Sequence, residues 1–332
     1  MSVVSTTTVE AVDDSSSQRP SVRSRFTTGG GYVLTLDCPE RPGIVNAVSG
    51  FLLEHHGDIR ELKQFDDARH GHCFLRVHFS VPSAASGDVA EAADDADDAD
   101  DADDAGDLVA RLTAAFGDVA ERFDMRFELR SAATPRRVLI MVSKFSHCLN
   151  DLLFRARVGE LPIDVVAVVS NHRDHESLVQ WHGIPFHHVP VTPETKPAAE
   201  AELLRLVAEH DVELVVLARY MQILSDHLVG ELTGRAINIH HSFLPSFKGA
   251  KPYHQAYDRG VKTVGATAHY VSADLDEGPI ISQQVREVDH ADTPDDLAAA
   301  GRDTECKALS NAVRWHCESR VILHGNRTVI LH

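Results

Sequence analysis

Three apolar stretches decide the fold class of the larger part of this chain: residues 137–142 read RVLIMV, residues 163–169 read IDVVAVV and residues 214–218 read LVVLA. Each has the length of a strand and lacks the regular polar alternation of a strand with one face in water. Helical patterns stand between them, over residues 149–157 and 199–209. Apolar strands that alternate with helices are typical of a parallel sheet covered on both faces. The sequence therefore predicts an α/β domain with a mostly parallel sheet over residues 137–332.

The part of the chain before this domain has a different order of elements. Apolar residues at strand or helix spacing predict four strands and two helices, at 32–36, 44–56 (a helix), 59–65, 73–81, 107–123 (a helix) and 125–129. Gly57 is predicted to cap the first helix. The order strand-helix-strand-strand-helix-strand predicts a ferredoxin-like βαββαβ domain over residues 30–130. A linker over 131–136, rich in small residues and ending near a proline, joins the two domains.

Two segments lack the periodicity of a folded element. Residues 1–29 are rich in Ser, Thr, Val and Asp, and predict a disordered leader. Residues 93–106 carry an Ala-Asp-Asp repeat, whose period of three fits neither a helix stripe nor a strand face. Repulsion among the aspartates favours a solvated, disordered insertion in the first domain. Metal buffering by this repeat is disfavoured, because nothing holds the carboxylates in a rigid cage.

Composition narrows the classes of protein to which the chain can belong. Its 332 residues carry a formal net charge of -18, whereas phosphate recognition needs clustered Lys and Arg. No apolar stretch approaches the roughly 18 residues that span a bilayer. The five cysteines include no CxxC pair, which suits free thiols in a reducing compartment. We therefore expect no nucleic-acid or membrane partner and a cytoplasmic location.

Polar residues that could carry chemistry follow the predicted strands, where parallel sheets bind their ligands. Residues 235–251 read RAINIHHSFLPSFKGAK. Asn238 and His240 share one face of an extended segment and could stabilise an oxyanion, whereas His241 would face the other way in a structural role. Asp276, in a later loop, could hold an imidazole protonated and position a water molecule. Taken singly, each segment is also compatible with ordinary loop hydrogen bonds.

Together, three segments resemble the folate-dependent formyltransferase family. The Asn-Ile-His-x-Ser-x-Leu-Pro-x-Phe pattern of that family is matched by Asn238, Ile239, His240, Ser242, Leu244, Pro245 and Phe247. Its His-x-Val-x-x-x-x-Asp-x-Gly-Pro-Ile pattern is matched by His269, Val271, Asp276, Gly278, Pro279 and Ile280. Residues 217–224, LARYMQIL, resemble the strand end at which the family cradles folate. The resemblance covers about residues 136–325 and implies a Rossmann-like formyltransferase domain.

The resemblance also implies the roles of individual residues. Asn238, His240 and Asp276 would be catalytic. Six residues would bind the folate substrate: Met221, Gln222, Ile223, Leu224, Ala273 and Leu275. The substrate would be 10-formyltetrahydrofolate, with no tightly bound cofactor. We predict no metal site, because the His70-x-His72 spacing has no H-x-E or CxxC partner.

The loop after the first strand of the second domain bears on the acceptor of the formyl group. Family members that formylate a ribonucleotide carry Ser-Gly-x-Gly-Ser-Asn there, whereas residues 143–148 read SKFSHC. Without glycines, backbone N–H groups cannot easily approach a phosphate. Water is therefore the expected acceptor, and hydrolysis would supply formate for purine synthesis and balance the one-carbon folate pools. A formyltransferase with an unrecognised amine acceptor and a non-catalytic folate or amino-acid sensor remain alternatives.

The first domain resembles an ACT domain. Its element order and the turn at residues 38–44, CPERPGI, carry this resemblance. ACT domains often bind a small amino acid between two copies of the domain. The resemblance therefore implies a possible amino-acid effector and a homo-oligomer, either a dimer or a tetramer.

Overall fold

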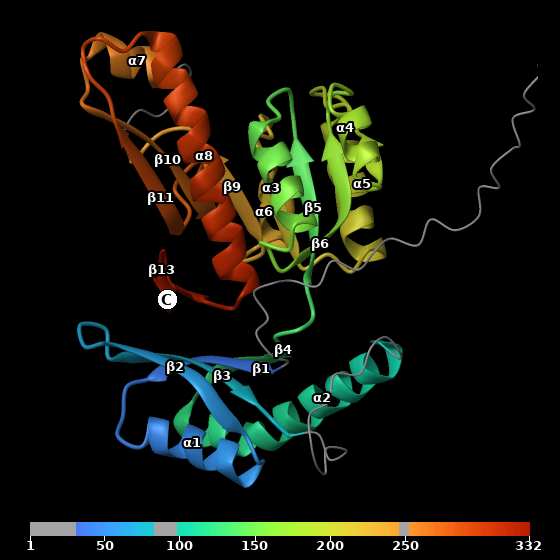
Figure 1. Cartoon of the computed structure of the whole chain (residues 1–332), viewed down its shortest axis with the longest axis vertical. Helices are drawn as coiled ribbons and strands as arrows, with labels where there is room; N and C mark the ends of the chain where they lie inside the picture. The colour runs from blue at the N-terminus through green and yellow to red at the C-terminus, as the bar shows by residue number, and fades with distance from the viewer. Residues whose placement is uncertain (1–30, 83–97, 246–251) are drawn as a thin grey trace, which may run out of the picture.

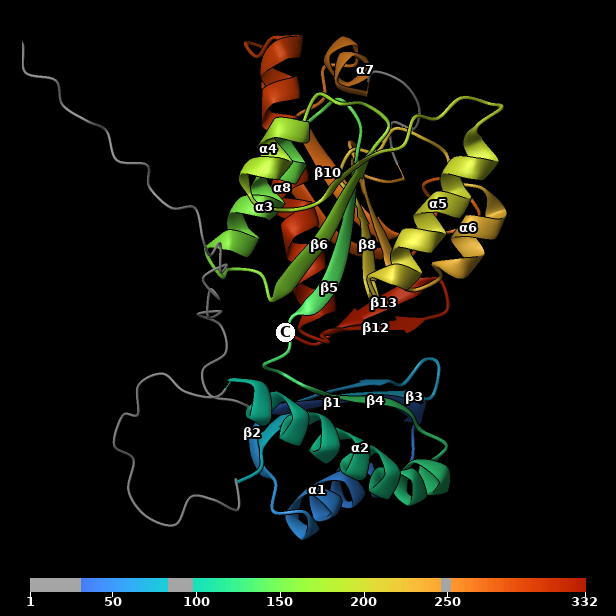
Figure 2. The same ribbon diagram turned by 90° about the vertical axis from the view of Figure 1, so that its right-hand side faces the viewer.

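The computed structural model describes residues 31–82, 98–245 and 252–332. They form a small and a larger α/β domain, stacked along the long axis in Figure 1. A hairpin of β12 (Val321–His324) and β13 (Arg327–Ile330) lies between the two domains (Figure 2). The predicted leader, residues 1–29, lies outside the described residues. Within the described ranges, no helix is long and apolar enough to cross a membrane.

The small domain has the predicted βαββαβ order. Its elements are β1 (Tyr32–Pro39), α1 (Ile44–Glu54), β2 (Asp58–Asp67), β3 (His72–Ser80), α2 (Asp98–Phe123) and β4 (Arg126–Ser131). The strands form an antiparallel sheet in the order β2-β3-β1-β4. Both helices bury their apolar sides against one face of this sheet. The ferredoxin-like prediction is confirmed for this domain.

The Ala-Asp-Asp repeat differs from the prediction of a disordered insertion over residues 93–106. Helix α2 begins at Asp98, so residues 98–106 are helical, whereas residues 93–97 lie outside the described residues. Alanine is the best helix former, which favours the helical conformation along the repeat. Leu112 and Phe116 anchor the later turns in the core. The repeat therefore extends an existing helix and needs no nucleus of its own.

The end of α1 also differs from the prediction that Gly57 is the capping residue. His56 adopts the left-handed conformation, with a φ of 58°, and Gly57 does not. Gly57 meets a different requirement: its N–H donates to the Leu52 carbonyl at 2.7 Å. A Cβ at this position would lie 3.0 Å from that same oxygen. The glycine is needed for close approach of the backbone.

The larger domain is built on a seven-stranded sheet in the order β11-β10-β9-β8-β5-β6-β7. The strands are β5 (Arg136–Val142), β6 (Ile163–Ser170), β7 (Phe186–His188), β8 (Leu214–Leu217), β9 (Ala236–His240), β10 (Thr263–Tyr270) and β11 (Ile280–Glu287). From β9 to β7 all neighbours run parallel, whereas β10 is antiparallel to both β9 and β11. The predicted mostly parallel sheet is confirmed.

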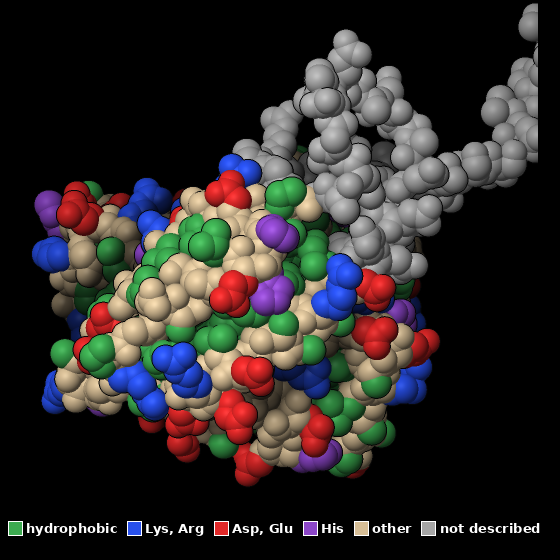
Figure 3. Space-filling view, turned by 90° about the horizontal axis from the view of Figure 1, so that it is seen from below, with side chains coloured by type: hydrophobic (Ala, Val, Ile, Leu, Met, Phe, Trp, Pro, Cys, Tyr) green, Lys and Arg blue, Asp and Glu red, His purple; other side chains and the backbone are tan. Residues whose placement is uncertain are grey.

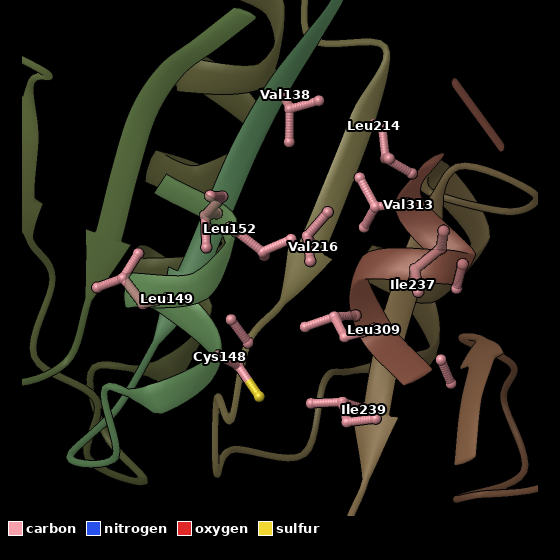
Figure 4. Packing of buried hydrophobic residues seen from close by; sticks show 14 of the residues in the cluster. Val138, Cys148, Leu149, Leu152, Leu214, Val216, Ile237, Ile239, Leu309 and Val313 are labelled. Atoms are coloured by element: carbon pink, nitrogen blue, oxygen red, sulfur yellow. The ribbon is translucent and has the colours of Figure 1, made fainter. Parts of the chain in front are cut away.

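Helices cover both faces of this sheet. One face packs against α3 (His147–Arg157), α4 (Glu176–Trp181) and α8 (Pro294–Cys317), and the other against α5 (Lys196–Glu209) and α6 (Asp226–Glu231). A short helix, α7 (Pro252–Asp258), packs on α8. Figure 4 shows Val216 of β8 between Leu152 of α3 and Leu309 of α8, with Leu149 of α3 farther away on the other side of that helix. Burial on both faces explains the unbroken apolar runs of the central strands.

The two domains contact each other where the sheet of the small domain meets the C-terminal end of α8. Arg76 on β3 is buried, and its guanidinium donates from Nε and Nη2 to the Glu318 carbonyl at 3.2 and 3.0 Å. The same side chain pairs with Glu61 at 2.6 Å. At the opposite end of the small domain, the face seen in Figure 3 mixes acidic, basic and hydrophobic side chains and shows no concentrated basic area.

Candidate active site

A cavity of about 750 Å³ opens at the carboxyl ends of β8 and β9. This is the edge at which open α/β sheets bind ligands, and the volume suits a drug-sized molecule. Side chains of α8 and of the loops after β5 and β10 complete its wall. All nine predicted site residues lie on this wall: Met221, Gln222, Ile223, Leu224, Asn238, His240, Ala273, Leu275 and Asp276.

His240 and Asp276 form an ion-pair contact in the cavity. Nδ1 of His240 lies 3.2 Å from Oδ1 of Asp276. His240 is only 5% exposed, and its other ring nitrogen, Nε2, is buried with no hydrogen-bond partner among the described residues. Because Nδ1 contacts the carboxylate, Nε2 is the nitrogen left for a bound molecule.

Asn238 is oriented by a second histidine, His269 on β10. The His269 ring has Nδ1 2.8 Å from the Tyr270 carbonyl, which can only accept a hydrogen bond. In the neutral ring Nδ1 therefore carries the proton, and Nε2 accepts from Nδ2 of Asn238 at 3.4 Å. Burial lowers the pKa of His269, which favours this neutral form. Within the described part of the chain, the second N–H of the Asn238 amide has no hydrogen-bond acceptor and could donate to a substrate oxygen.

The loop that carries Asp276 is shaped by its backbone. Asp276 has a φ of 58°, a left-handed conformation that Asp tolerates better than most residues. Two positions later, a Cβ on Gly278 would lie 1.8 Å from the Tyr270 carbonyl oxygen, so only glycine fits. Burial alone would raise the pKa of Asp276, but the hydrogen bond and charge of His240 hold it below its ordinary value. The loop thus presents an ionised carboxylate to the imidazole.

A second polar cluster lines the cavity around Glu305 of α8. Its Oε2 lies 2.7 Å from Nε2 of His147, and its Oε1 accepts from the Tyr253 hydroxyl at 2.7 Å. Nε of Arg219 is 3.4 Å from Oε2. Burial alone would raise the pKa of Glu305, but His147, Arg219 and Tyr253 together hold it below its ordinary value. The carboxylate is therefore ionised and held by three partners.

Comparisons with known proteins show the family to which the chain belongs. A model of the formyl transferase family matches residues 136–313, from the start of β5 into α8. A formyltetrahydrofolate deformylase from Corynebacterium sp. (strain P-1) is 62% identical over 300 residues, which cover 90% of this chain and 98% of the relative. The chain belongs to the formyltetrahydrofolate deformylase family.

Solved structures extend the match to both domains. The crystal structure of a deformylase from Burkholderia mallei has a TM-score of 0.81 at 47% identity and covers 92% of this chain and 100% of that one. Glycinamide ribonucleotide transformylase 1 from Symbiobacterium toebii has a TM-score of 0.56 at 31% identity, and covers 60% of this chain and 95% of that one. The match to the deformylase thus takes in more of this chain than the match to the transformylase.

In this member of the deformylase family, the glycine-free loop after β5 is tied down by its own side chains. Ser143 donates from Oγ to Asn171 at 2.7 Å and accepts from the Met221 N–H at 3.0 Å. His147, the first residue of α3, contacts Glu305. These contacts hold the loop in place, and each of its residues carries a Cβ where the glycine-rich loops of ribonucleotide formylases let the backbone approach a phosphate. Phe247 of the sequence motif lies outside the described residues.

Among the cavity-wall residues that were not predicted as site residues are Arg219, His241, His269 and Glu305. His241 lies beyond the end of β9, where strand alternation no longer applies, so it lines the same cavity as His240 and does not face away. His269 stands in the recognised motif, and that position was its only signal. Glu305 lies in the middle of a long helix with no local pattern to mark it.

Two groups of side chains have the composition of metal ligands, although the sequence predicts no metal site. Asp67, His70 and His324 converge at the junction of the domains, and His147, Cys148 and Glu305 converge beside the cavity. Arg219 brings a permanent positive charge to 3.4 Å from the carboxylate of the second group. Burial and Cys306 hold the pKa of the Cys148 thiol far above its ordinary value, so the thiol stays protonated. Neither property suits a cation.

Proposed function

We propose that this protein hydrolyses 10-formyltetrahydrofolate to formate and tetrahydrofolate. The observation that carries the proposal is the contact of His240 with Asp276 in the cavity, with Nε2 of His240 unpartnered among the described residues and Asn238 on the same wall. An amide, an imidazole and a carboxylate are the groups that attack of water on a formyl carbon requires. Membership of the deformylase family supports the same reaction.

The reaction forms one bond and breaks one. Asp276 orients a water molecule and takes one of its protons as the oxygen attacks the formyl carbon. The developing oxyanion accepts hydrogen bonds from the Asn238 amide and from Nε2 of protonated His240. The bond between carbon and N10 then breaks, and N10 leaves with a proton passed on by this acid–base pair. Formic acid loses its own proton to give formate.

The folate moiety is assigned to the apolar part of the wall. Met221, Ile223 and Leu275 are large hydrophobic side chains that remain 54%, 64% and 59% exposed, and all three line the cavity. Exposed apolar groups around a cavity of this size suit a flat heterocycle, which would bury them on binding. Backbone groups of residues 221–224 would supply the hydrogen bonds that orient the ring.

The test is to incubate the purified full-length protein with 10-formyltetrahydrofolate alone, in buffer with a metal chelator. We expect formate and tetrahydrofolate to accumulate in equal amounts, because the proposal requires neither a second substrate nor a metal. Release of tetrahydrofolate only after an amine is added, with the formyl group recovered on that amine and not as formate, would instead indicate a formyltransferase. Binding of the folate without any turnover would indicate a sensor.

We further propose that the protein acts in the cytoplasm, where its formate supplies purine synthesis. A separate proposal concerns the small domain, which would bind an amino acid between two copies of the chain. The ACT-like βαββαβ fold supports this second proposal. The effector proposal is tested by adding methionine or glycine and measuring two quantities. Analytical ultracentrifugation gives the sedimentation coefficient, and a formate-release assay gives the turnover rate. A sedimentation coefficient and a turnover rate that do not respond to either amino acid would contradict the effector proposal.

A further inference from the structure

Arg219 is a buried cation on the cavity wall that takes no part in the proposed hydrolysis. It follows β8 directly and is 8% exposed. Its φ of 64° is a left-handed conformation, uncommon for a residue other than glycine. Among the described residues, its Nε and Nη1 are buried without a hydrogen-bond partner. Unused donors in a buried guanidinium cost free energy unless a bound molecule accepts from them.

The surroundings of Arg219 fix its orientation and offset its positive charge. Its guanidinium carbon lies 5.3 Å from the centroid of the Phe145 ring. Glu305 is 3.4 Å from Nε, but its two oxygens are already engaged by His147 and Tyr253. The guanidinium is therefore held in place, and one nearby negative charge offsets much of its own.

His241 lies on the cavity wall with Arg219 and directly follows His240 in the chain. Its ring centroid lies 5.2 Å from that of His240, and it lines the same cavity. Burial, together with the charges of Arg219 and His240, lowers the pKa of His241 to about 4. His241 is therefore neutral at physiological pH. It adds no charge to the cavity wall that it shares with His240, Asp276 and Arg219.

We propose that Arg219 forms a subsite for a small monocarboxylate, the formate that hydrolysis releases into the cavity. This inference rests on the proposed function. The planar fork of a guanidinium matches the two oxygens of a carboxylate. Because Glu305 offsets one unit of charge, the subsite favours a monoanion held weakly over a phosphate dianion held tightly. Weak binding is what a product that must leave requires.

The experiment measures formate binding to the full chain in the absence of folate, by saturation-transfer NMR of sodium formate. We expect a dissociation constant in the millimolar range, with inorganic phosphate and chloride at equal ionic strength competing poorly. Arg219→Gln is expected to weaken formate binding by about tenfold or more, because the charge-assisted fork is lost. Arg219→Lys keeps the charge without the fork. Its dissociation constant for formate is expected to lie between those of the wild type and Arg219→Gln.

Arg302→Gln is the matched control, because Arg302 lines the same cavity but is exposed. The dissociation constant of this variant for formate is expected to stay within about twofold of the wild-type value. Circular dichroism and thermal unfolding show whether each variant is folded. If Arg219→Gln does not fold, Arg219→Lys is used alone to test the effect on formate binding. Formate binding that is absent from the wild type, unchanged in both Arg219 variants, or displaced equally well by phosphate would overturn the subsite. Formate binding without deformylase turnover would instead sink the proposed function and leave the subsite standing.

Discussion

Asp276 is the residue on which the proposed chemistry depends most. Replacement by Asn keeps the size of the side chain but removes the charge that faces His240 at 3.2 Å. We expect Asp276→Asn to lower kcat by about 10²–10⁴-fold, the usual contribution of a positioned acid or base. The rate of formate release at saturating folate measures this effect.

Asp274→Asn provides the control on the same loop. Asp274 is exposed, and only its backbone carbonyl is engaged, by Ser272 and Glu277. Its variant should keep kcat within about twofold, since an isolated surface charge contributes little. Equal losses in the two variants would show that the loop is sensitive to any change and that the carboxylate of Asp276 has no special role.

His269 acts through Asn238, which makes it a positioning residue. His269→Leu removes the acceptor for the Asn238 amide, and we expect kcat to fall by about 10–100-fold, as for other residues that orient an active-site group. The KM for the folate should change little. His269→Gln can place an amide oxygen near the position of Nε2 and should recover part of the loss. A similar kcat for the Leu and Gln variants would contradict the positioning role.

At the scale of elements, α8 carries Glu305 into the cavity wall. Glu305→Gln would leave Arg219 buried without a carboxylate, and we expect the free energy of unfolding at pH 7 to fall by about 3 kcal/mol. The pKa of Glu305 in the folded protein lies below its ordinary value of 4.5. Its contribution is therefore complete above about pH 4.5 and is lost as the pH falls through the lowered pKa. Urea unfolding across pH should show the difference from wild type shrinking below about pH 4.5.

Asp303 lies on the same helix and provides the control for Glu305. Its pair with Arg286 spans 3.4 Å between two largely exposed side chains. Asp303→Asn is expected to change the free energy of unfolding by about 0.5 kcal/mol or less. A Glu305→Gln variant as stable as Asp303→Asn would mean that the buried cluster contributes nothing net to stability.

Phe116 anchors the later turns of helix α2 in the core of the small domain. Phe116 is fully buried and packs edge-on against Phe51 of α1 at 5.0 Å and Phe127 of β4 at 4.8 Å. Phe116→Ala should destabilise the small domain by about 3–5 kcal/mol, the usual result of emptying such a site. Thermal unfolding measures the loss. Thr113→Ala, at an exposed position of the same helix, should change stability far less.

Periodicity predicts the elements whose packing it reflects. The unbroken apolar runs of β5, β6 and β8 are buried on both faces, so the parallel sheet could be predicted from them. The Ala-Asp-Asp repeat carries no such period, and its helix is imposed by the amphipathic turns that follow it. Arg219 and Glu305 meet only in the folded chain, so no local pattern marks them. Sequence motifs identify His240 and Asp276. The residues around them, such as Arg219 and Glu305, are known only from the tertiary structure.

At the scale of the whole molecule, α8 connects the cavity to the small domain. Its 24 residues span about 36 Å at the usual rise of a helix. Ala298, Arg302 and Glu305 line the cavity along the first half of the helix, and the Glu318 carbonyl just beyond its other end accepts from Arg76. A change in the small domain therefore has a rigid element through which to reach the site. The contact of Arg76 is one of several between the domains, beside pairs such as Arg130–Glu213 and Arg327–Asp67, and it reaches the end of α8.

Arg76→Met keeps most of the side-chain volume but removes both hydrogen bonds to Glu318 and the pair with Glu61. We expect the contact between the domains to weaken by about 2 kcal/mol, because buried hydrogen bonds to a charged group are lost. Calorimetry should then show the small domain unfolding at a lower temperature than the larger one. Arg60→Met, which removes an exposed pair with Asp58, should unfold as the wild type does. If Arg76→Met also unfolds like the wild type, the domains do not depend on this contact, and α8 cannot carry a signal that begins there.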